Sequence, residues 1–200
     1  YGGDINIKTD SLTITNRGTI SSTSYGSGAA GNVTINSGSV EVLNGSAITS
    51  SAYGSGNGGK IEVIADSVLI SGYTPELTMD DTGQLSLMPS GIASQAMTMG
   101  GSAGDVRISA RRLQLLDGGT IGTDTFGPGN GGDIQITADT VLISGVNAAM
   151  REFLIAEGGD PNWASSHLLS MSHNNLMGDK ATGSPGNIKI TAGSFEAQNG

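Results

Sequence analysis

The side chains of this sequence that could carry out chemistry are few and scattered. Asp80 and Asp81 are adjacent carboxylates, a pattern that can supply an acid/base pair or help to hold a metal ion. Adjacent acids in a polar segment are more often hydrated surface groups. His167 and His173 have no Ser or Cys partner in a recognisable motif, and two imidazoles alone do not complete a metal site. The sequence therefore predicts no catalytic residue, no metal site and no bound cofactor.

A glycine pattern typical of dinucleotide-binding turns, G-x-G-x-x-G, begins at Gly26, Gly54 and Gly127. A nucleotide site needs this turn between a strand and a helix, so that the helix N-terminus faces the pyrophosphate. Here each copy leads into a run with the alternation of a strand. We therefore interpret these glycines as corners of a repeating chain path.

Glycine turns that end in an acid, at Asp4, Asp105 and Asp133, resemble the nonapeptide repeat that binds calcium. In that repeat an acid-bearing turn returns after about nine residues, so that neighbouring turns share an ion. In this chain the turn returns after 28 residues, and Asn32 and Lys60 take the place of the acid in two copies. This position indicates a solvated edge, and the sequence leaves calcium binding there open.

Six copies of one unit organise the chain that must position these side chains. Each copy begins with glycine, any residue, and two β-branched residues separated by one position; the glycines are Gly3, Gly31, Gly59, Gly104, Gly132 and Gly186. Their spacings of 28, 28, 45, 28 and 54 residues indicate a 28-residue unit with extra segments in the third and fifth copies.

Each unit contains three short runs in which apolar and polar residues alternate, as in strands with one buried face. In the second unit the runs are built on Val33 and Ile35, on Val40 and Val42, and on Ile48. The third run begins in successive units at Ile20, Ile48, Ile92 and Ile121, each followed two places later by Ser or Thr. A propeller blade needs about four strands in roughly 40 residues or more, so it fits poorly. We predict an all-β fold, a right-handed parallel β-helix (β-solenoid) of about six coils of 28 residues with two inserted loops.

The repeated phrase resembles a known family. Residues 127–145, and again residues 56–72, are similar to the repeats of filamentous haemagglutinin-like exoproteins of Gram-negative bacteria. The resemblance covers the chain apart from the two insertions. It implies a long right-handed parallel β-helix that is exported by two-partner secretion and acts as an adhesin or stalk, extracellular or at the outer membrane surface.

We expect residues 1–200 to form a single β-helix segment of a longer array. Neither end shows the polar or helical segment with which solenoids cover open strand edges. Further β-helix coils, of the same or another chain, are therefore predicted partners of this segment.

The two insertions, residues 73–90 and 146–166, are the predicted attachment surfaces, because variation on a rigid scaffold concentrates in loops. In the second insertion, residues 147–157 have apolar side chains at helical spacing and precede two glycines, which predicts a short amphipathic helix on the β-helix wall. The candidate partner-binding residues are Tyr73, Glu76, Asp80, Asp81, Phe153 and Trp163.

Three aromatic residues recur at one place in the unit. Tyr25 and Tyr53 lie 28 residues apart, and Phe126 holds a similar place before its glycine turn. They predict an aromatic ladder along one edge, for which packing between coils is a stronger explanation than ligand binding. A sugar-stacking role for Trp163 also stays open.

Charge and composition exclude several classes of partner. The net charge of −9 argues against nucleic acid. The longest apolar runs are far too short to span a bilayer, so we expect no membrane insertion by this segment. Cysteine is absent, which removes any disulfide framework and agrees with export as an unfolded chain.

The function predicted from these observations is not enzymatic. We expect a structural and adhesive segment of a secreted or cell-surface exoprotein, a rigid stalk whose loops attach to surface glycans or proteins of a host or bacterium. One alternative is a self-assembling extracellular filament subunit that stacks end to end. The other is a polysaccharide-degrading β-helix enzyme, which would need clustered carboxylates or basic groups on one strand face.

Overall fold

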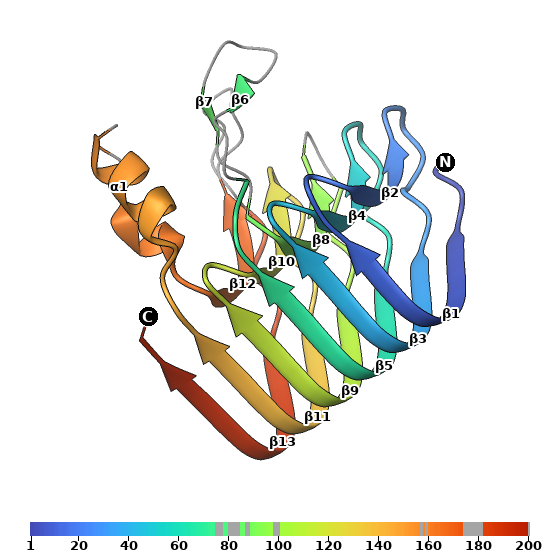
Figure 1. Cartoon of the computed structure of the whole chain (residues 1–200). Helices are drawn as coiled ribbons and strands as arrows, with labels where there is room; N and C mark the ends of the chain where they lie inside the picture. The colour runs from blue at the N-terminus through green and yellow to red at the C-terminus, as the bar shows by residue number, and fades with distance from the viewer. Residues whose placement is uncertain are drawn as a thin grey trace.

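Two parallel sheets dominate the computed structural model, which describes residues 1–74, 78–79, 85–86, 89–97, 101–156, 158, 160–173 and 182–199 (Figure 1). The six-stranded sheet contains, in spatial order, β1 (Ile5–Ile14), β3 (Val33–Leu43), β5 (Ile61–Ser71), β9 (Val106–Leu116), β11 (Ile134–Ser144) and β13 (Ile188–Gln198). The five-stranded sheet contains β2 (Thr19–Ser24), β4 (Ala47–Ala52), β8 (Gly91–Ala96), β10 (Thr120–Phe126) and β12 (His167–His173). This arrangement is an all-β, parallel β-helix-like fold.

Strand pairing follows the sequence repeat position by position. Ile5 pairs with Val33, and Val33 pairs with Ile61. The register continues across the first insertion, where Ile61 pairs with Val106. Each position of the unit therefore forms a column that runs across the sheet, as the 28-residue spacing predicts.

The first two predicted runs of each unit form one long strand instead of two strands. Each long strand bends near its middle (Figure 1). The pairing omits one position there and resumes on the next residue; the omitted residues are Asp10, Gly38, Asp66, Arg111, Asp139 and Gly193. The sequence predicted a turn between the first and second runs, but the structure has a bend within one strand. The residues before and after the bend pair with the same neighbouring strands.

The long strands end at a position that requires left-handed backbone. The residues there have positive φ in every copy: Asn16, Asn44, Gly72, Asp117, Gly145 and Asn199. Asn, Asp and Gly tolerate this conformation best, which explains their recurrence after the second apolar run.

The core between the two sheets is almost purely aliphatic. The inward columns of the six-stranded sheet hold mostly Ile, Val and Leu, and one inward column of the five-stranded sheet adds Ile; Val33, Ile48, Ile92 and Ile121 are fully buried. Such a narrow core has little space for aromatic rings, in keeping with the low aromatic content.

A column of buried hydroxyl groups crosses the interior beside this core. Ser50 donates to the carbonyl oxygen of Gly31 at 2.8 Å and accepts from the backbone N–H of Gly59 at 2.9 Å. The same position in the other short strands is occupied by Ser22, Ser94, Thr123 and Ser170, and each of these hydroxyls donates to a glycine carbonyl. The column joins the five-stranded sheet to the glycine corner opposite it.

The glycines of the G-x-G-x-x-G pattern are corner residues, as predicted, and lead into β3, β5 and β11 rather than into helices. Their main requirement is steric. A Cβ on Gly31 would overlap the backbone of Gly3, and one on Gly59 would overlap the carbonyl of Gly31. The corners therefore stack backbone directly on backbone.

Candidate functional site

The two insertions meet on the outer face of the five-stranded sheet. Each is closed by an antiparallel bridge, Tyr73 with Pro89 and Val146 with Ser165. Between its ends the first insertion includes the short strands β6 (Thr78–Met79) and β7 (Leu85–Ser86). The Tyr73 hydroxyl donates to the backbone oxygen of Trp163 at 2.7 Å, so a hydrogen bond joins the two insertions.

Tyr73 is the centre of a small apolar cluster outside the main core. Its ring is buried against Met150 and Ala164, and Val146, Phe153 and Leu154 pack around them. Burial raises the pKa of the Tyr73 hydroxyl to about 12, so the group stays neutral and acts as a donor.

The second insertion folds as predicted into a short helix, α1 (Ala148–Ala156). Asn147 begins it, because its side-chain oxygen accepts from the backbone N–H of Met150 at 3.0 Å. The helix is followed by the 3-10 turn η1 (Pro161–Ala164), which Asp160 caps through the N–H of Asn162. These two elements hold Met150, Leu154 and Trp163 over the sheet.

A groove of about 410 Å³ lies between the insertions and the sheet, and we call it the insertion groove. It is lined by Ala47, Thr49, Tyr73, Pro89, Gly91, Ala93, Gln95, Thr120, Ile121, Gly122, Asp124, Met150, Leu154, Trp163, His167 and Leu169. Three outward residues of β8 and β10, Gly91, Ala93 and Gly122, are small and leave space above the floor of the groove. Its volume falls within the range of small-molecule sites, about 300–1,000 Å³.

Asp124 is the one acidic residue among the described residues that line the insertion groove. Its Oδ1 is buried and has no hydrogen-bond partner among the described residues, although Gln95 hydrogen-bonds to the carboxyl group. Burial raises the pKa of Asp124, and Gln95, His173 and His167 oppose this effect. The groove thus contains a desolvated carboxyl group whose hydrogen-bonding capacity is only partly used.

His167 stands at the end of the insertion groove nearest η1. Its Nδ1 lies 2.7 Å from the carbonyl oxygen of Ser165, which assigns the proton to Nδ1 because a carbonyl only accepts. Its ring meets Trp163 edge to face, with the ring centroids 5.7 Å apart. The imidazole therefore packs against the indole at this end of the groove.

The aromatic column forms as two separate stacks. Tyr25 stacks on Tyr53 with centroids 5.1 Å apart, and Phe126 stacks on His173 at 4.8 Å. Met97 follows β8, in the chain position between these two pairs. The predicted ladder is therefore correct for the tyrosines, but Phe126 has an imidazole as its partner.

Among the candidates predicted from sequence, Tyr73 and Trp163 line the insertion groove, and Phe153 packs in the apolar cluster behind it. Glu76, Asp80 and Asp81 lie outside the described residues. Sequence reasoning missed Asp124 and set His167 aside. Strand alternation places Asp124 on the outer face of β10, but no sequence signal shows that the insertions cover it there.

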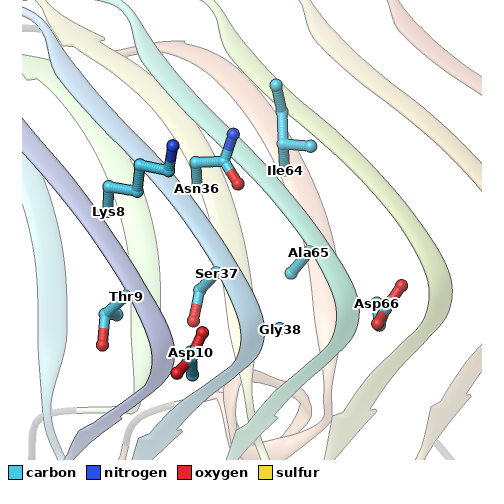
Figure 2. A pocket seen from close by; sticks show the side chains of 9 residues that line it. All are labelled: Lys8, Thr9, Asp10, Asn36, Ser37, Gly38, Ile64, Ala65 and Asp66. Atoms are coloured by element: carbon cyan, nitrogen blue, oxygen red, sulfur yellow. The ribbon is translucent and has the colours of Figure 1, made fainter.

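A larger hollow of about 720 Å³ lies at the bend of β1, β3 and β5, where Lys8, Asn36 and Ile64 form a row (Figure 2). All its residues come from one sheet, and one of its carboxylates, Asp66, is paired with Arg111 at 3.0 Å. A ligand there would be contacted from one side only. The insertion groove, with a floor and two walls, is the better candidate site.

The acid-bearing corners serve as hydrogen-bond acceptors between neighbouring chain turns. A side-chain oxygen of Asp4 accepts the backbone N–H of Asn32 at 2.7 Å, and Asn32 accepts that of Lys60 at 2.9 Å. Asp133 accepts the N–H of Asn187 in the same way. Within the described ranges, no group of three or more His, Cys, Asp or Glu is arranged to hold a metal ion.

No family model, curated protein or solved structure matches the chain. Among the described residues, no helix has the length and apolar character needed to cross a membrane. The geometry of the insertion groove is therefore the basis on which a function is assigned.

Proposed function

We propose that this chain is a rigid, non-enzymatic segment of a secreted or cell-surface exoprotein, and that it attaches to a partner through the insertion groove. The proposed rod is a right-handed β-helix of six coils. The support for stiffness is the continuous register of both sheets, in which every long strand between β1 and β13 is paired on both sides.

The observation that carries the proposal is the convergence of the two insertions on one groove. They leave the chain at separate units, yet Tyr73 and Trp163 are hydrogen-bonded and the walls close over a floor of small residues. Loops without a binding role would not be expected to form a shared concave surface. A stiff scaffold with one concave, partly apolar surface suits attachment.

The proposed location is outside a Gram-negative bacterium, with export by two-partner secretion, and it rests on the resemblance of the repeats to filamentous haemagglutinin-like exoproteins. Surface glycans or proteins are the proposed partners. The outer edges of β1 and β13 have no strand partner within the described chain, and Ile188 and Phe195 on β13 are 44% and 52% exposed. These edges support the stacking of further coils, from the same chain or from another copy in a filament.

The test is adhesion of beads coated with the protein to a panel of bacterial and host cell surfaces. Ala93→Phe fills the floor of the groove without touching the core. Ser21→Phe is the matched control, because Ser21 faces outward from β2 in the same sheet and does not line the groove. We expect Ala93→Phe to abolish adhesion and Ser21→Phe to preserve it; equal adhesion of both variants would contradict the proposal.

One observation favours the enzymatic alternative. Asp124 has a raised pKa and lies near two imidazoles, which is a pattern that general acids share. A polysaccharide hydrolase of the usual kind needs a second carboxyl group across the bond, and the part of the groove that the structure describes contains only Asp124. Release of reducing ends or unsaturated products from acidic polysaccharides by the wild type, but not by Asp124→Asn, would establish the enzyme and reject the stalk.

A further inference from the structure

The floor of the insertion groove presents a carboxyl acceptor, that of Asp124, which the described residues do not use fully. Asp124 Oδ1 is buried and lacks a partner among the described residues, while Gln95 supplies one hydrogen bond to the carboxyl group. A buried acceptor without a donor is costly, so a ligand that brings a donor to this oxygen gains a hydrogen bond. The donor that offsets most of this cost is a cationic one.

The walls of the insertion groove favour a donor that is attached to an apolar chain. Met150, Leu154 and Leu169 are apolar, and Trp163 presents an indole that is 44% exposed. Lys and Arg carry a charged head on a long apolar stem, which lies well against such a surface. The indole face adds a cation–π contact for a head group that passes over it.

The charges of the groove and of the chain both favour a cation. Among the described residues that line the groove there is no Lys or Arg, and the chain has a net charge of −9. His167, the one imidazole among the described lining residues, places its Nδ1 on the Ser165 carbonyl. An anionic ligand would meet Asp124 without a neutralising partner, and a neutral saccharide would find few polar groups beyond Gln95 and the threonines.

We propose that the insertion groove receives a basic side chain, a Lys ammonium or an Arg guanidinium, from a protein partner, with the charge at Asp124 and the stem against the apolar walls. This inference rests on the attachment function proposed above. It narrows the partner from any surface molecule to a protein that projects a basic residue.

The test uses the full chain and its single tryptophan, Trp163, which lines the groove and reports on occupation of it. The probes are 4-phenylbutylammonium and the neutral 4-phenylbutanol, which share a stem and differ in the head group. Fluorescence titration at neutral pH compares the wild type with Asp124→Asn. The control is Asp139→Asn, which removes an exposed carboxylate from β11 in the other sheet.

We expect the wild type and Asp139→Asn to bind the ammonium at least about tenfold more tightly than the alcohol, the factor that a charge-assisted hydrogen bond supplies. Asp124→Asn should lose this preference and keep its affinity for the alcohol, which also shows that its groove is intact. Equal affinities of the wild type for the two probes, or no binding of either, would overturn the inference.

The adhesion test separates this inference from the proposed function. If Ala93→Phe abolishes adhesion while the ammonium shows no advantage, the groove is the attachment site and the partner's chemistry is not cationic. If the ammonium preference is present while Ala93→Phe leaves adhesion unchanged, the cation site exists and attachment takes place elsewhere.

Discussion

Replacing Ser50 by alanine tests the physical role of the buried hydroxyl column. The Ser50 side chain is fully buried, and its Oγ joins the carbonyl of Gly31 to the N–H of Gly59, which belong to neighbouring chain turns. Alanine leaves both backbone groups buried without these partners. At about 1–3 kcal/mol for each unsatisfied group, the free energy of unfolding should fall by about 2–6 kcal/mol.

The measurement is urea unfolding followed by circular dichroism of the strands. With a slope of roughly 2 kcal/mol per molar urea, the midpoint should fall by about 1–3 M. Ser21→Ala is the control, since Ser21 is exposed on the neighbouring strand β2 and its change should stay within about 0.5 kcal/mol. Ser50→Thr should recover part of the stability, because Thr123 holds the same position of the unit and its hydroxyl also donates to a buried glycine carbonyl, in its case that of Gly132, at 2.6 Å.

A loss below about 0.5 kcal/mol for Ser50→Ala, equal to that of Ser21→Ala, would refute the reasoning. It would mean that water or a small backbone shift satisfies both groups, and that the hydroxyl column follows from the repeat without stabilising it.

Three further predictions concern the corner, the bond between insertions and the groove. Gly59→Ala should lower the free energy of unfolding by more than about 2 kcal/mol, a cost similar to that of overpacking a core site, because the new Cβ would overlap the Gly31 carbonyl. Thermal unfolding measures this loss. Tyr73→Phe should lower stability by about 1 kcal/mol and raise the proteolysis rate of the second insertion, because Trp163 loses its hydrogen bond. Asp124→Asn should stabilise the fold at neutral pH and lose this advantage in acid, as denaturant titrations at several pH values can show.

The sign of the Asp124 prediction follows from proton linkage. Its folded pKa is raised, so between the unfolded and folded pKa values the native state binds more protons and stability falls as pH rises. Asparagine removes this loss. If the stability difference between Asp124→Asn and the wild type grew on acidification, the raised pKa of Asp124 would be contradicted. A Gly59→Ala variant of normal stability would contradict the close stacking of the corners. A Tyr73→Phe variant with unchanged proteolysis would contradict the role given to the bond between the insertions.

The repeat, the strand register and the core can be predicted from the sequence because they depend on local alternation and a constant period. Every 28-residue return places Ile or Val in the same column, and the pairing of Ile5 with Val33 follows directly. The short strand β12 was not predicted, since the second insertion shifts its spacing and the run begins with His167 rather than with a β-branched residue. Its pairing with β10 restores the column, so Leu168 lies beside Ile121.

Alternation also could not distinguish a turn from a bend in the long strands. Both interrupt the pattern at a small or polar residue such as Gly38, and the difference is decided by whether neighbouring strands stay paired across it. The serine at the third run was visible as a repeat, but its role required the position of the opposite corner. That position is set by how the two sheets close on each other.

The sequence by itself determined the scaffold of this protein, and the tertiary structure decided its site. A residue that recurs in every unit can be assigned to a column of the sheet from its spacing alone. The two insertions occur once each, and their docking depends on contacts such as that of Tyr73 with Trp163. That docking places Asp124, a partly buried outward strand residue that nothing singles out in the sequence, among the residues that line a groove. The desolvation of a carboxyl group depends on the residues around it. Around Asp124 these include residues of the two insertions, which begin about 50 residues before it and end about 40 residues after it.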